Sequence, residues 1–225
     1  MSSPRYRAIL FDLDGTLTDP YLGITRTFIY ALGQLGVHPP DEATLRTWIG
    51  PPLQDSFRAY LGDEALARQG VAAYRARYGT IGMYENRVYS GIPELLSELR
   101  TAGKRLVLAT SKLHSVAQAI LEHFQLAPYF DATYGASLDA SLSAKADIIA
   151  AALDQLAPGE RQACVMVGDT AYDVAGAQAH GLPCIAVSYG YGTAESLAAA
   201  GPDAIARSVV ELRELLLGGT NGTGF

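Results

Sequence analysis

The stretch Ala8-Ile-Leu-Phe-Asp-Leu-Asp-Gly-Thr16 decides the fold. Its first four residues, Ala8 to Phe11, form an apolar run of the length expected for a fully buried strand, and turn residues follow at once. Side chains two positions apart on extended backbone point the same way, so Asp12 and Asp14 can face one pocket. The stretch therefore predicts a buried strand with a pair of carboxylates at its carboxyl end.

Three further apolar runs repeat this arrangement along the chain. Each run is followed by turn residues and then a helical pattern. The runs are Leu106 to Ala109, Ala163 to Val167 and Ile185 to Val187. We expect the intervening helices at Pro93 to Ala102, Ser115 to Phe124, Ala144 to Leu156, Ala171 to His180 and Ser208 to Leu217. This alternation predicts an α/β fold, a doubly wound parallel sheet with a Rossmann-like core.

The stretch between about Pro20 and Asn86 breaks the alternation. It has no strand-like run, only amphipathic segments between Gly and Pro residues, at Ile24 to Leu35, Glu42 to Trp48, Leu53 to Leu61 and Glu64 to Tyr78. A helical insertion after the first strand is typical of a cap domain. We expect an α/β catalytic core at 1–19 and 87–218, an inserted all-helical cap domain at 20–86 and a flexible tail at 219–225.

Composition excludes several classes of partner. The 17 basic residues against 23 acidic ones give a net charge of −6, and no Lys/Arg run supplies a nucleic-acid surface. The early apolar stretch is interrupted by aspartates, so neither a signal peptide nor a membrane span fits, and we expect a cytoplasmic protein. Cys164 and Cys184 lie in apolar runs without metal-type spacing and are expected to be buried, reduced thiols. The sequence leaves monomer and homodimer open.

Residues that follow the predicted strands are suited to handling a phosphate group. In an open α/β sheet the ligand site lies beyond the carboxyl ends of the strands. Thr110-Ser111-Lys112 follows the second run, Gly168-Asp169-Thr170 follows the third, and Asp173 comes one helical turn later. Three converging carboxylates repel one another unless a cation neutralises them, and Mg²⁺ prefers such oxygen ligands. The sequence therefore predicts a magnesium site at this edge.

A carboxylate beside a metal ion can attack phosphorus. Asp12 is the candidate nucleophile, and an acyl-phosphate formed on it would later be hydrolysed. Asp14 would protonate the leaving oxygen and then take a proton from the attacking water. Thr110 and a lysine can stabilise the charge that develops on the phosphoryl group.

Four segments, in order, resemble the motifs of the haloacid dehalogenase superfamily: Asp12-Leu-Asp14-Gly-Thr16, Thr110-Ser111-Lys112, Lys145 and Gly168-Asp169-x-x-x-Asp173. The resemblance implies that Asp12 is nucleophile and metal ligand, and that Asp14 is the acid/base whose backbone carbonyl also binds the metal. It places the phosphate on Thr110, Ser111 and Lys145, and magnesium on Asp169 with support from Asp173. Asp14 also implies phosphoryl chemistry, because the dehalogenating members lack an aspartate there.

Further segments look similar to the phosphoglycolate phosphatase-like and bacterial 5′-nucleotidase-like branch; they are Gly50 to Phe57, Gly135 to Asp139, Lys145 to Ile149 and Tyr189 to Gly192. Many relatives carry Pro after the third-motif lysine, whereas Ala146 stands here, which favours the nucleotidase side. The resemblance implies a magnesium-dependent phosphomonoester hydrolase acting through an aspartyl-phosphate. Its substrate would be a small phosphorylated metabolite, phosphoglycolate or a nucleoside 5′-monophosphate.

Other interpretations stay open from the sequence. A phosphomutase would return the phosphoryl group to a sugar, and a non-enzymatic protein would only keep the fold, although clustered carboxylates disfavour that. Lys112 could be an ordinary exposed first-turn residue. The helical spacing of Tyr74 and Tyr78 favours packing over a nucleobase pocket, and Gly50-Pro51-Pro52 is either a helix breaker or a loop over the site.

Overall fold

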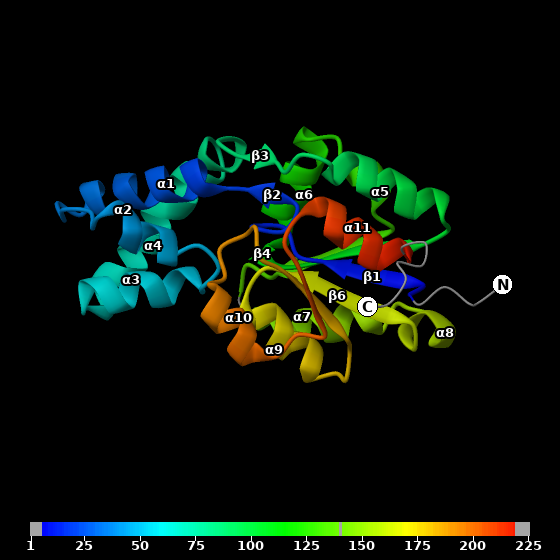
Figure 1. The fold of residues 1–225 in the computed structure, drawn as a ribbon. Helices are drawn as coiled ribbons and strands as arrows, with labels where there is room; N and C mark the ends of the chain where they lie inside the picture. Colours follow the sequence, from blue (N-terminus) through cyan, green and yellow to red (C-terminus); the bar gives the residue numbers. More distant parts are fainter. Residues whose placement is uncertain (1–5, 140, 219–225) are drawn as a thin grey trace. The chain divides into compact units, whose positions relative to one another are not determined.

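The structure, a computed structural model, describes residues 6–139 and 141–218 (Figure 1). It divides into two compact units, one of residues 18–87 and one of residues 6–17 with 88–218. The expected tail at 219–225 lies outside the described residues. None of the described helices is long and apolar enough to cross a membrane.

A six-stranded parallel sheet forms the larger unit. Its strand order is β5-β4-β1-β6-β7-β8. The bounds are β1 Ala8–Phe11, β4 Arg105–Leu113, β5 Ala132–Ala136, β6 Cys164–Gly168, β7 Cys184–Val187 and β8 Ala204–Ala206. All four residues of β1 are buried, because β1 pairs with β4 on one side and β6 on the other. The predicted α/β fold with a parallel sheet is confirmed.

Helices cover both faces of this sheet (Figure 1). One side carries α5 Ile92–Thr101, α6 His114–His123 and α11 Val209–Leu217, and the other carries α7 Lys145–Leu153, α9 Ala171–Gln178 and α10 Ala194–Ala200. A 3₁₀ turn, η2, spans Ala127–Tyr129, and a short helix, α8, spans Pro158–Arg161. Leu10 and Met166 of the sheet pack with Ile148 of α7 in one buried cluster. The sheet and α7 therefore share one close-packed core.

Several elements of the sheet differ from the sequence prediction. The strand expected at Leu106 to Ala109 runs on to Leu113, so Thr110-Ser111-Lys112 lies within β4, which changes register against β5 after Thr110. Strands β5 and β8 and helices α8 and α10 were not predicted. β5 is only partly buried over its first three residues and β8 keeps one exposed residue, so neither carries the apolar run that marks a central strand.

The smaller unit is helical. Its helices are α1 Tyr21–Gln34, α2 Glu42–Thr47, α3 Leu53–Leu61 and α4 Glu64–Tyr78, with the 3₁₀ turn η1 at Gly82–Tyr84 and a two-stranded sheet of β2 Thr18–Asp19 and β3 Arg87–Val88. Phe28 lies at the centre of its aromatic core, with ring centroids 4.7 Å from Trp48, 5.1 Å from Phe57 and 4.8 Å from Tyr74. Tyr74 and Tyr78 stack and are buried, which confirms packing as their role.

Candidate active site

Two carboxylates stand at the carboxyl end of β1. The Asp12 backbone N–H donates to the Val167 carbonyl at 2.9 Å, so Asp12 continues the strand pairing, and its side chain is buried. Asp14 follows in a turn that Gly15 makes with a φ of +82°, a conformation that favours glycine. Burial raises the pKa of the Asp14 carboxyl above its ordinary value, although Lys112 opposes the shift. The central strand thus fixes both carboxylates at one edge.

Lys145, the first residue of α7, joins carboxylates from two elements. Its Nζ lies 2.8 Å from Asp12 Oδ1 and 2.7 Å from Asp173 Oδ1. It also donates to the Ala109 carbonyl at 2.9 Å. Burial alone would lower the pKa of this ammonium, but the charges of Asp12 and Asp173 outweigh burial and raise it. Lys145 is therefore a fixed, buried cation beside Asp12.

The second motif lies on β4, the neighbour of β1. Thr110 is buried and its Oγ1 accepts from the Lys112 backbone N–H at 3.3 Å, whereas Ser111 is exposed. The Nζ of Lys112 lies 2.6 Å from Asp14 Oδ2, and only 9% of the Lys112 side chain is exposed. The structure therefore excludes the exposed first-turn alternative for Lys112 and pairs it with the predicted acid/base.

Asp169 and Asp173 come from the end of β6 and the first turn of α9, and both are fully buried. Oδ2 of Asp173 accepts from the Thr170 backbone N–H at 3.0 Å and from its hydroxyl at 2.9 Å, which caps α9. Oδ2 of Asp169 accepts from the Tyr191 backbone N–H at 2.8 Å. Burial, together with neighbouring negative charge, raises the pKa of both carboxyls, although Lys145 opposes the shift.

The arrangement of these carboxylates fits a divalent cation. Oxygens of Asp12, Asp169 and Asp173 lie within 4.8 Å of one another. Oδ1 of Asp169 is buried and has no hydrogen-bond partner among the described residues, and such a group costs free energy unless a ligand satisfies it. The carboxylate of Asp14 brings the number of carboxylates at the site to four. The ammoniums of Lys112 and Lys145 balance two of them, so the formal charge of the site is −2. Oxygen ligands and this charge suit Mg²⁺.

A glycine-containing loop after β7 surrounds Asp169. A Cβ on Gly190 would lie 2.4 Å from Oδ2 of Asp169, and a Cβ on Gly15 would lie 1.9 Å from the same oxygen. The Tyr189 hydroxyl donates to the Thr16 carbonyl at 3.0 Å and ties the loop to the turn after β1. The loop therefore holds Oδ2 of Asp169, whereas Oδ1 has no hydrogen-bond partner among the described residues. The sequence prediction missed this contact, because Tyr191 acts through its backbone.

Known proteins resemble this chain along most of its length. A family model for haloacid dehalogenase-like hydrolases matches residues 9–187. A 5′-nucleotidase of Pseudomonas aeruginosa is 44% identical over 94% of this chain and 96% of its own. Tyrosine-protein kinase PtkA of Mycobacterium tuberculosis is 41% identical over 92% of this chain and 72% of its own. A crystal structure described as a predicted phosphatase from Clostridium acetobutylicum is 44% identical, covers 96% of this chain and 99% of its own, and has a TM-score of 0.88. The chain belongs to the haloacid dehalogenase-like hydrolase family, as its motifs predict.

Proposed function

We propose that this protein is a magnesium-dependent phosphomonoester hydrolase that acts on a small phosphorylated metabolite through an aspartyl-phosphate. One observation carries the proposal. Asp12, Asp169 and Asp173 bring buried carboxylate oxygens within 4.8 Å of one another, directly beside the Lys145 ammonium. A buried group of this kind supports binding of a cation and of a phosphate dianion side by side.

The proposed metal ligands are the Asp12 and Asp169 carboxylates and the Asp14 backbone carbonyl, with Asp173 in support. Magnesium, when bound, neutralises charge on the phosphate and on the attacking carboxylate. Asp173 has a second role in the proposal: its contacts with Lys145 and the start of α9 hold the lysine in place. We therefore describe Asp173 as a positioning residue.

In the proposed first step Asp12 attacks phosphorus, and the bond between phosphorus and the leaving oxygen breaks. Asp14, when protonated, gives its proton to that oxygen. Burial favours the protonated form of Asp14, whereas its ion pair with Lys112 disfavours it. In the second step water attacks the aspartyl-phosphate, Asp14 accepts its proton, and Asp12 is regenerated with release of inorganic phosphate.

The phosphate group is proposed to bind Thr110, Ser111 and Lys145. Lys145 and Thr110 are buried and fixed by packing, which supports a preorganised site. The helical unit is proposed to act as the cap that selects the substrate. Nucleoside 5′-monophosphates are the first substrates to test, because a 5′-nucleotidase is 44% identical to this chain, and phosphoglycolate is the second. We further propose a cytoplasmic location, which the two free, buried thiols support.

A phosphoryl transferase is the second candidate. Tyrosine-protein kinase PtkA, at 41% identity, carries a name that implies a different phosphoryl acceptor, and a phosphomutase would use a sugar hydroxyl. The groups assigned above form the phospho-enzyme and protonate the leaving oxygen, whichever acceptor follows. The choice between water and another hydroxyl therefore needs a direct assay.

The test is phosphate release by the purified full chain, with magnesium or with a chelator, across nucleoside 5′-monophosphates, phosphoglycolate and sugar phosphates. Magnesium-dependent release that Asp12→Asn abolishes is expected. Phosphorylation of a tyrosine peptide from ATP, or an isomerised sugar phosphate, without free phosphate would establish the transferase instead. No turnover in any of these assays would contradict both candidates.

A further inference from the structure

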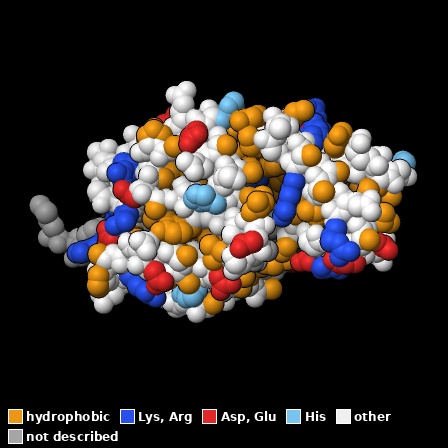
Figure 2. All heavy atoms as spheres, turned by 180° about the vertical axis from the view of Figure 1, so that it is seen from behind, with side chains coloured by type: hydrophobic (Ala, Val, Ile, Leu, Met, Phe, Trp, Pro, Cys, Tyr) orange, Lys and Arg blue, Asp and Glu red, His pale blue; other side chains and the backbone are white. Residues whose placement is uncertain are grey.

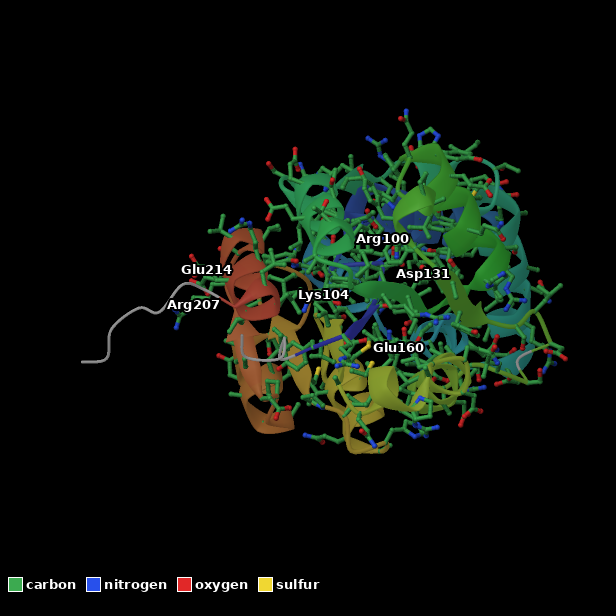
Figure 3. All side chains as sticks on the ribbon, turned by 90° about the vertical axis from the view of Figure 1, so that its right-hand side faces the viewer. Arg100, Lys104, Asp131, Glu160, Arg207 and Glu214 are labelled. Atoms are coloured by element: carbon green, nitrogen blue, oxygen red, sulfur yellow. The ribbon has the colours of Figure 1, made fainter. Side chains whose placement is uncertain are left out.

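Arg100, Lys104, Asp131 and Glu160 lie at the opposite edge of the sheet, where the strands begin (Figure 3), and line a polar hollow. Its volume is about 310 Å³, and it is lined by Arg100, Gly103, Lys104, Arg105, Asp131 and Glu160. Arg105 is the first residue of β4, whereas Thr110 of the candidate active site lies five residues further along that strand. Five residues of strand span roughly 16 Å. The hollow is therefore separate from the candidate active site.

Positive charge predominates in this hollow, although the whole chain carries a net charge of −6. Three cations line it against two carboxylates. The lining residues therefore carry a local formal charge of +1, which favours an anion.

Both carboxylates of the hollow are already held by other groups. Oδ2 of Asp131 accepts from the Arg100 guanidinium at 2.6 Å and from the Leu106 backbone N–H at 2.9 Å. Oε2 of Glu160 accepts from the backbone N–H at the start of its own helix at 2.9 Å and from Arg105 at 3.2 Å. These bonds pair Asp131 with Arg100 and Glu160 with Arg105. Neither carboxylate forms an ion pair with Lys104 among the described residues.

Lys104 and Arg105 retain donors that the described protein does not use. Lys104 is 6% exposed, and its Nζ donates to the Tyr6 carbonyl at 2.5 Å. No ion pair to Lys104 occurs among the described residues, and an ammonium has three donors. The Nε of Arg105 is buried and lacks a hydrogen-bond partner within the described ranges. Buried charges and donors of this kind are stabilised by a bound counter-ion.

We propose that this hollow binds a small tetrahedral oxyanion of the class of inorganic phosphate. Lys104 and Arg105 donate to the anion from the floor of the hollow, and Arg100 adds charge at its rim. Arginine and lysine form the strongest of their hydrogen bonds with such anions. A volume of about 310 Å³ is several times the roughly 30 Å³ that one water molecule occupies in the liquid, so the anion enters with part of its water shell. The site does not depend on the proposed phosphatase activity.

The experiment is an NMR titration of the ¹⁵N-labelled full chain with potassium phosphate, with potassium chloride at matched ionic strength as reference. Backbone amides of Gly103, Lys104 and Arg105 report on the hollow, and those of Gly168 and Asp169 report separately on the candidate active site. Saturable phosphate-specific shifts are expected at the first group. Lys104→Met should weaken this binding by about tenfold or more, the factor for one charge-assisted hydrogen bond, with phosphate release unchanged.

Arg207→Gln is the matched control, since the Arg207 side chain is 82% exposed, and it should leave the affinity unchanged. If Lys104→Met does not fold, Arg100→Gln replaces it, because this half-exposed rim residue can be changed without opening the core. Shifts confined to the active-site amides, equal shifts with chloride, or unchanged affinity in Lys104→Met (or in Arg100→Gln where it replaces that variant) would each overturn the proposal.

Discussion

Two sets of carboxylates, one in each unit of this protein, are placed in opposite ways. In the helical unit the side chains of Asp55 and Glu64 are 59% and 48% exposed and pair with Arg58. At the carboxyl edge of the sheet Asp169 and Asp173 are fully buried. Water solvates the first pair at little cost, whereas burial penalises the second unless a cation is present. The comparison teaches that only the buried carboxylates carry an electrostatic cost that a ligand can relieve.

The pKa shifts have opposite signs in the two regions. The Arg58 guanidinium beside Glu64 holds the pKa of that carboxyl below its ordinary value. Burial raises the pKa of Asp169, and the charges of Asp173 and Asp12 add to the rise. Charged groups also lie scattered over the face seen in Figure 2, among apolar and neutral side chains. Surface charge is therefore ordinary in this protein, and buried charge is concentrated where function is proposed.

The largest expected effect comes from Asp12→Asn. It removes the proposed nucleophile while keeping the size of the side chain, so we expect kcat to fall on the order of 10⁴-fold or more, as for other catalytic groups. The measurement is phosphate release with magnesium on the best substrate of the panel. Circular dichroism and thermal unfolding check that the variant is folded. A folded variant with normal turnover would place the nucleophile elsewhere.

Removal of magnesium is expected to have the second-largest effect, and it tests whether the buried carboxylates differ from the exposed ones in their need for a cation. The folded-state pKa of Asp169 is raised above 3.8, so without a cation its contribution to stability is lost as pH rises from about 4 through the raised pKa. Magnesium should offset this loss and stabilise the fold by about 2.7 kcal/mol at one hundred times its Kd. Thermal unfolding with magnesium or chelator should show a larger shift at pH 7.5 than at pH 5. Equal shifts at the two pH values would contradict the role of buried charge.

A smaller effect is expected from Gly190→Ala, which tests whether the loop orients Asp169. The added Cβ would lie 2.4 Å from an Asp169 carboxylate oxygen and 2.4 Å from the Gly15 carbonyl oxygen, so the loop must shift and Asp169 with it. Disturbing groups that orient a metal ligand typically weakens metal binding about 10–100-fold. Isothermal titration with Mg²⁺ measures this without an activity assay. Gly33→Ala is the control, because a Cβ there meets nothing within 4 Å; equal affinity in both variants would remove the loop from the site.

The sequence predicted the parts of this site that depend on local pattern. Asp12 and Asp14 follow an apolar run, and this order of residue types on a central strand places both at the carboxyl edge. Two helices of the smaller unit, α3 and α4, were predicted to the residue and α2 to within one residue, whereas α1 begins three residues before its predicted start. Amphipathic segments between Gly and Pro residues carry this signal. Periodicity and caps are short-range signals, so a single sequence carries them.

Contacts between distant segments were beyond such reasoning. Lys112 pairs with Asp14 only because β4 extends past its apolar run and brings that lysine beside β1. The contact of Tyr191 with Asp169 uses a backbone N–H, so the side chain at that position gives no signal. Strand β8 has an exposed residue and lies at the edge of the sheet, so its three residues resemble a loop. Contacts between segments far apart in the sequence decide all three, and only the folded chain reveals them.

The smallest effect is expected from Asp55→Asn, which makes the same chemical change as Asp12→Asn in the other region. Asp55 Oδ1 lies 2.8 Å from Arg58, but both side chains are more than half exposed. Exposed pairs of this kind contribute little, because water solvates each partner when the other is lost. We expect no measurable change in the urea midpoint of unfolding and none in phosphate release. A marked loss of either would mean that charge in the helical unit matters beyond solvation, and burial alone would then no longer separate the two sets of carboxylates.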